Sequence, residues 1–107
     1  MEEREPYVRE LLDAYRTTPG TSGHVRRADR LLAEQLYERG VPLLVAQHAL
    51  ILAAARRLSR PANAPPLTPI RSLAYFAPVI DELLADGPDP EYFLYLRHKL
   101  QRLLAER

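Results

Sequence analysis

Apolar residues recur at intervals of three and four along most of this chain, which is the spacing of one face of an α-helix. No segment shows the sustained alternation of apolar and polar residues that is typical of a half-buried β-strand. Clusters of proline, glycine and threonine interrupt the helical pattern. We therefore expect an all-α fold, a compact bundle of about five helices. The predicted helices cover residues 6–17, 22–39, 42–58, 77–85 and 89–105.

The segment from Val41 to Ala55 is apolar on nearly every side. A helix of this kind is usually packed by neighbours on several sides, so we expect 42–58 to be the central helix of the bundle. The apolar run is too short to cross a bilayer. Arg56 and Arg57 at its end complement the negative pole of the helix dipole.

The second helix is predicted to end at Gly40, a residue that adopts the left-handed conformation after a helix without strain. Its apolar spacing predicts a buried stripe on one face, with the arginines beside it on the solvent side. The members of this stripe are Val25, Ala28, Leu32 and Leu36.

Proline complicates the last two helices. Pro78 would remove a hydrogen bond inside a helix, so we expect either a short turn through Tyr75 followed by a helix over 77–85, or one kinked helix. Asp89 and Pro90 have the cap and first-turn chemistry of a new helix. The residues of this last helix expected in the core are Phe93, Leu96, Leu100, Leu103 and Leu104.

The composition limits the class of protein. A length of 107 residues with 47% apolar content predicts one domain over 1–107, either a whole protein or part of a larger one. The polar, acidic start predicts no secretory signal, and the absence of cysteine fits a reducing cytoplasm, where we expect the protein. The net charge is only +1, and 14 of the 15 basic residues are arginine.

Catalytic and metal-binding motifs are missing from the sequence. It contains no nucleotide-binding glycine loop, no zinc-protease HExxH and no hydrolase GxSxG. His24, His48 and His98 stand in three different segments without a shared ligand spacing, whereas a metal site needs convergent ligands. We expect His48 at the edge of the core and the other two exposed. The sequence therefore predicts no enzyme, no metal and no cofactor.

Arginines gather in two places along the chain. One group lies near the start of the second helix; it either contacts phosphates or forms a solvated face paired with Asp29 and Glu34. A second group flanks the proline-rich segment 59–68 and would converge if that segment folds back. Tyr75 would add a ring for stacking on a base. The first group is Arg26, Arg27 and Arg30, and the second is Arg56, Arg57, Arg60 and Arg71.

The order of these features resembles the helical C-terminal domain of the DnaD/DnaB-like primosomal replication proteins. The resemblance covers about residues 7–86 and rests on the first helix, the break at 19–23, the segment AQHALILAA and a Tyr-x-x-x-Ile-x-x-x-Trp signature. Tyr75 and Val79 match the first two signature positions, Leu83 stands where tryptophan is expected, and Pro78 interrupts the motif. The resemblance implies DNA binding near the signature and beyond it, which adds Arg97, Lys99 and Arg102 as candidates.

These observations lead to one expected function and one alternative. The first is a non-catalytic DNA-binding and assembly module in replication initiation or a mobile genetic element. Its binding would be weak, sensitive to salt and indifferent to base sequence. The alternative is an all-helical protein–protein interaction or dimerisation adaptor that binds no nucleic acid, which the near-neutral charge favours.

Overall fold

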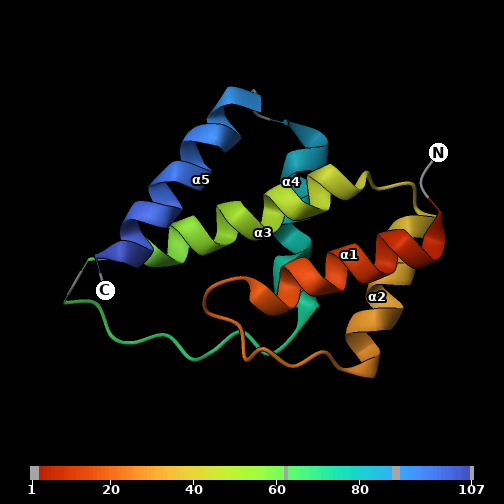
Figure 1. Ribbon diagram of the computed structural model, residues 1–107, viewed down its shortest axis with the longest axis horizontal. Coiled ribbons are helices and arrows are strands. Elements are labelled where there is room, and N and C mark those ends of the chain that lie inside the picture. Colours follow the sequence, from red (N-terminus) through yellow and green to blue (C-terminus); the bar gives the residue numbers. More distant parts are fainter. Residues whose placement is uncertain (1–2, 62, 88–89, 107) are drawn as a thin grey trace.

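Helices account for most of the chain in the computed structural model, which describes residues 3–61, 63–87 and 90–106. The described residues contain five α-helices and one short 3-10 helix, so the predicted all-α bundle is confirmed (Figure 1). The proposed Asp89 cap lies outside these residues. The elements are α1 (Arg4–Thr17), α2 (Arg27–Glu38), α3 (Leu43–Leu58), η1 (Leu73–Phe76), α4 (Ala77–Ala85) and α5 (Pro90–Ala105).

Helix α3 is the centre of the molecule, as its apolar sequence predicts. It packs against α1, η1, α4 and α5 (Figure 1). Small side chains let these neighbours approach closely: Ala46 and Ala49 are fully buried, and so are most residues from Leu50 to Ala55. Leu44, in the first turn, is exposed because no neighbour covers that side of the helix start.

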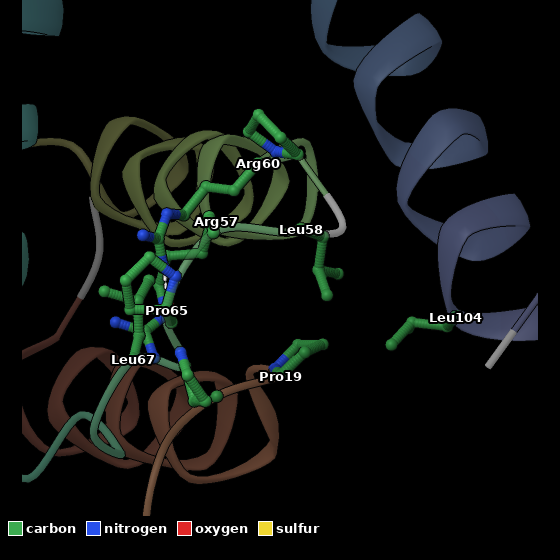
Figure 2. A pocket seen from close by; sticks show the side chains of 11 residues that line it. Pro19, Arg57, Leu58, Arg60, Pro65, Leu67 and Leu104 are labelled. Atoms are coloured by element: carbon green, nitrogen blue, oxygen red, sulfur yellow. Dashed lines mark hydrogen bonds between the residues drawn. The ribbon is translucent and has the colours of Figure 1, made fainter.

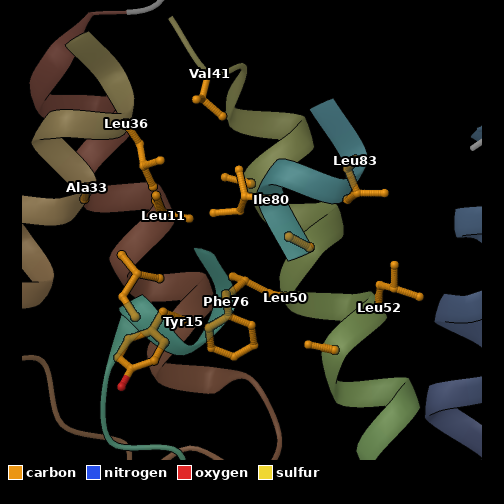
Figure 3. Close-up of a cluster of buried hydrophobic side chains, with 14 of the residues drawn as sticks. Leu11, Tyr15, Ala33, Leu36, Val41, Leu50, Leu52, Phe76, Ile80 and Leu83 are labelled. Carbon is orange, nitrogen blue, oxygen red and sulfur yellow. The ribbon is translucent and has the colours of Figure 1, made fainter. Parts of the chain in front are cut away.

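The core joins helices that are distant in the sequence. The rings of Tyr15 and Phe76 meet edge to face with their centroids 6.0 Å apart, and Leu11 and Leu36 lie above them (Figure 3). Ile80 of α4 points into the same cluster. The neighbouring Tyr75 is exposed, so of the aromatic pair at 75–76 only Phe76 belongs to the core.

Two loops lie side by side beneath the helices. The backbone N–H of Ile70 donates to the Gly20 carbonyl at 2.7 Å, and the N–H of Ser22 donates to the Ile70 carbonyl at 2.8 Å. These bonds form an isolated bridge between the segment after α1 and the segment before η1. The bridge anchors the chain leading into η1, where a 3-10 turn precedes Pro78. Pro78 therefore occupies the second position of α4, where its missing N–H costs no helical bond.

The start of α2 differs from the prediction. The helix begins at Arg27 rather than near Ser22, and Val25 and Ala28 are exposed. The buried face instead holds Asp29, Ala33 and Leu36. The predicted stripe is thus wrong at its beginning, because an acidic residue takes the inward position in the first turn. Gly40, with φ of +76°, ends the helix as predicted.

The outer end of α5 also differs. Phe93, Leu96 and Leu100 are buried as expected, but Leu104 is exposed and Leu103 only half-buried. The reason is that α5 packs mainly against α3, and one neighbouring helix buries only a narrow stripe.

Candidate functional site

Three arginines stand on the surface at the first turn of α2. Arg26 is the residue preceding the helix, Arg27 is its first residue and Arg30 lies one turn further on. All three are exposed. No ion pair of these guanidinium groups occurs within residues 3–61, 63–87 and 90–106.

The acidic residue of this turn, Asp29, points into the protein instead of toward the arginines. Its side chain is 1% exposed. Its Oδ2 accepts a hydrogen bond from the backbone N–H of Arg26 at 2.8 Å, and its Oδ1 accepts one from the backbone N–H of Leu73 at 2.9 Å. One carboxylate therefore caps α2 and holds the start of η1 against it.

The interpretation that Asp29 and Glu34 neutralise the arginines is wrong. Asp29 is buried and bonded to backbone groups, and the Glu34 carboxylate lies 2.9 Å from the guanidinium of Arg4 on α1. Both acids are thus occupied elsewhere in the fold. The three arginines therefore have no ion-pair partner among the described residues, which the sequence pattern alone did not reveal.

Tyr15 lies on the inner side of this capping arrangement. The residue is fully buried, and its hydroxyl has no hydrogen-bond partner among the described residues. Burial raises the pKa of the hydroxyl, and the negative charge of Asp29 raises it further. The phenol therefore stays neutral at physiological pH.

The basic group at α2 has a fourth candidate close by in the fold. The segment carrying Arg71 is bonded to Gly20 and Ser22 on one side of it, through Ile70, and to Asp29 on the other, through Leu73. These bonds bring the backbone of Arg71 beside the start of α2. Arg71 is exposed and has no ion pair among the described residues.

The second predicted arginine group comes together only in part. Arg56, Arg57 and Arg60 line one hollow of about 430 Å³ together with Tyr75, whereas Arg71 does not line it. Arg56 forms a two-pronged ion pair with Glu82 of α4, with N–O distances of 2.6 and 3.0 Å. That pair holds α4 against α3 and reduces the positive charge of the group.

The other two arginines of this group hold the proline-rich segment in place. Arg57 donates to the Thr68 carbonyl at 2.9 Å, and its guanidinium carbon lies 5.7 Å from the centre of the Tyr75 ring. Arg60 donates to the Pro65 carbonyl at 2.9 Å. The proline-rich segment therefore folds back over the end of α3. This folding back was the predicted condition for these arginines to come together.

Arg57 and Arg60 also line another, slightly larger hollow. It has a volume of about 460 Å³ and lies at the end of α3. Figure 2 shows the two arginine side chains on one wall, while Leu58, Pro19 and Leu104 approach the hollow from three different elements. We call this feature the basic hollow.

The three candidates on α5 are separated rather than clustered. Arg97 lines a hollow shared with α1 and α3, Arg102 lies beside Tyr95 on another face, and Lys99 is half-buried. The helical turn of about 100° per residue directs Arg97 away from the other two. Lys99 and Arg102 are three residues apart and share a side of α5, on which only Arg102 is exposed.

The histidines stand as the sequence predicts. His48 is half-buried and stacks on Phe93, with centroids 3.7 Å apart and an angle of 14° between the rings. Burial lowers its pKa, and the charge of Arg97 lowers it further. His24 and His98 are exposed. Within the described part of the chain, no three histidine or acidic side chains are placed to share a metal ion.

Comparison with known proteins adds no relative. No protein-family model, no curated protein and no solved structure matches this chain. Within the described residues, no helix has both the length and the apolar character needed to cross a membrane. The function of this chain therefore has to be inferred from its own residues.

Proposed function

We propose that this chain is a non-catalytic module that binds the phosphate backbone of DNA, and that it serves replication initiation or a mobile genetic element in the bacterial cytoplasm. The observation that carries the proposal is the inward position of Asp29. Glu34 is paired with Arg4, so among the described residues neither of these acids forms an ion pair with the arginines at the start of α2. Those arginines are Arg26, Arg27 and Arg30, with Arg71 on the neighbouring segment.

The chemistry of this surface favours contacts to phosphate rather than to bases. Guanidinium groups bind phosphate oxygens through two parallel hydrogen bonds. Backbone contacts of this kind carry no sequence information, and they weaken as salt rises because bound counterions are no longer released favourably. A net charge of +1 and a small arginine cluster support weak, non-specific binding. The resemblance to the DnaD/DnaB-like C-terminal domain supports the same function.

The other candidate residues contribute less to the proposed DNA binding. Arg56 is paired with Glu82, which offsets its charge, and Arg57 gives donors to the Thr68 carbonyl and the Tyr75 hydroxyl, so each has fewer donors left for a phosphate than an unpaired arginine. Tyr75 lies over Arg57 and is exposed, which leaves its ring available to one unpaired base. On α5, Arg97 lies on a different side from Lys99 and Arg102, and Lys99 is half-buried.

The test is a salt titration of binding to labelled single- and double-stranded oligonucleotides, followed by fluorescence anisotropy. Replacing Arg26 and Arg27 by alanine should weaken binding about tenfold and lower the salt slope by about 2, because two phosphate contacts are lost. The melting temperature should hardly change, since both side chains are exposed. The matched control replaces Arg9 and Arg16, two exposed arginines of α1. Equal losses in both double variants, or no binding at low salt, would refute the proposal.

The alternative, a protein-interaction or dimerisation adaptor, is favoured by one observation on α5. This helix packs mainly against α3 and leaves Leu94 and Tyr95 exposed by 57% and 53%. Tyr92 adds a third large apolar side chain at the surface. Sedimentation separates the two functions: a stable dimer that binds no DNA would identify the adaptor.

A further inference from the structure

A second hollow shares the lining residue Pro19 with the basic hollow. The second hollow has a volume of about 450 Å³ and lies between α1 and α5, with α3 as its floor. Leu50 and Ile51 form the floor, and Leu100 and Arg97 line the α5 wall. We call the two hollows together the trough.

The trough combines positive charge with aliphatic surface. Among the described residues that line it, three are arginines, namely Arg57, Arg60 and Arg97, and none is acidic. Leucine and proline side chains line it as well, including Leu58 and Leu104, which lie to one side of the two arginines at the basic hollow (Figure 2). Such a surface is complementary to a ligand that carries carboxylates and apolar groups on one short chain.

We propose that the trough binds a short acidic peptide segment of a partner protein, with aspartate or glutamate side chains at the arginines and apolar side chains between them. The arginines have donors to spare. A guanidinium has five N–H donors. The described contacts use two donors of Arg57, to Thr68 and Tyr75, and one of Arg60, to Pro65. Gln47, on the rim, offers an amide to the peptide backbone.

The lining argues against a nucleic acid as the occupant. Single strands are held by aromatic rings on which successive bases stack, and no aromatic side chain lines either hollow. Apolar side chains beside guanidinium groups favour a peptide, because a leucine or phenylalanine of the partner would bury aliphatic surface there. The trough lies away from Arg26 and Arg27, so this proposal does not depend on DNA binding by the start of α2.

The test uses a labelled peptide of aspartate and glutamate with interspersed leucines, and fluorescence anisotropy as the readout. Two matched peptides replace either the leucines by serine or the acidic residues by lysine. We expect only the acidic peptide with leucines to bind well. In the protein, Arg60→Gln with Arg97→Gln should weaken its binding about tenfold, because two charge-assisted contacts are lost. Arg57 is left unchanged because it holds the segment 59–68.

Two control variants separate the trough from the rest of the surface. Arg9→Gln with Arg102→Gln removes the same charge from outside the trough and should leave peptide binding unchanged. Leu104→Ala removes an apolar side chain of the basic hollow and should weaken binding, whereas Leu94→Ala, on the same helix and also exposed, should not. Circular dichroism of each variant verifies that it is folded.

Four results would overturn the proposal. The first is that the acidic peptide with leucines fails to bind. The second is that the serine peptide binds equally well, which would leave only an unspecific anion-binding surface. Equal weakening by Arg9→Gln with Arg102→Gln would exclude the trough as the site. The fourth is that an oligonucleotide displaces the peptide and that the trough variants weaken oligonucleotide binding too. These two observations together would assign the trough to nucleic acid. Peptide binding that persists in the Arg26 and Arg27 double variant, whether or not DNA binds, would support it.

Discussion

Replacing Asp29 by alanine tests the contact on which the proposed DNA surface depends. The carboxylate is 1% exposed and accepts hydrogen bonds from the backbone N–H groups of Arg26 and Leu73 at 2.8 and 2.9 Å. Hydrogen bonds to a charged group contribute about 1.5–3 kcal/mol each, and part of that is offset by the removal of a buried charge. We therefore expect Asp29→Ala to lower the free energy of unfolding by about 3 kcal/mol.

Asparagine at position 29 separates the effect of the negative charge on stability from the effect of the side-chain shape. Asp29→Asn keeps one carbonyl oxygen for one of the two backbone donors, so we expect about half the loss caused by alanine. The control is Glu34→Ala, which removes an exposed-edge ion pair to Arg4 and should cost about 1 kcal/mol or less. Urea denaturation followed by circular dichroism gives all three values. If Asp29→Ala were as mild as Glu34→Ala, Asp29 would not be the buried capping residue described here, and the argument for unpaired arginines at α2 would fail with it.

Three further predictions concern the core and its ionisable groups. Tyr15→Phe should leave stability unchanged or raise it by up to about 1 kcal/mol, because the hydroxyl it removes is buried without a partner; a clear loss in urea denaturation would contradict this. Leu52→Ala should cost about 2–5 kcal/mol and Leu44→Ala far less, since only Leu52 is buried; similar losses would refute the central position of α3. Stability should fall as the pH drops below about 6.5, because the pKa of His48 is lowered in the folded protein and the unfolded chain binds the proton more readily. Denaturation of His48→Gln at neutral and acidic pH checks this: the variant should lose part of the dependence, and an unchanged profile would exclude His48 as its source.

The chain's own pattern was sufficient for the architecture. Apolar spacing predicted the all-α class and the central place of 42–58, because a helix that is apolar on all sides is stable only when neighbours surround it. Local chemistry placed the end of α2 at Gly40 and the break before Pro78, since glycine reaches the left-handed conformation without strain and proline fixes φ and lacks an N–H. These features depend on residues that are close in the sequence, and the sequence pattern predicts such features well.

Contacts between distant segments decided the rest. Asp29 is an acid among arginines in the sequence, so the pattern suggested an ion pair at the surface. Burial of the carboxylate is favourable only because the fold places the Leu73 N–H beside it as a donor. The pattern Arg26-x-x-Asp29 did carry a signal, an acid three residues after the residue that caps the helix. The trough had none, because residues of α1, α3 and α5 and of the loop after α3 line it together. Periodicity fixes which face of a helix is apolar, but which charges stay unpaired depends on what the completed fold brings next to them.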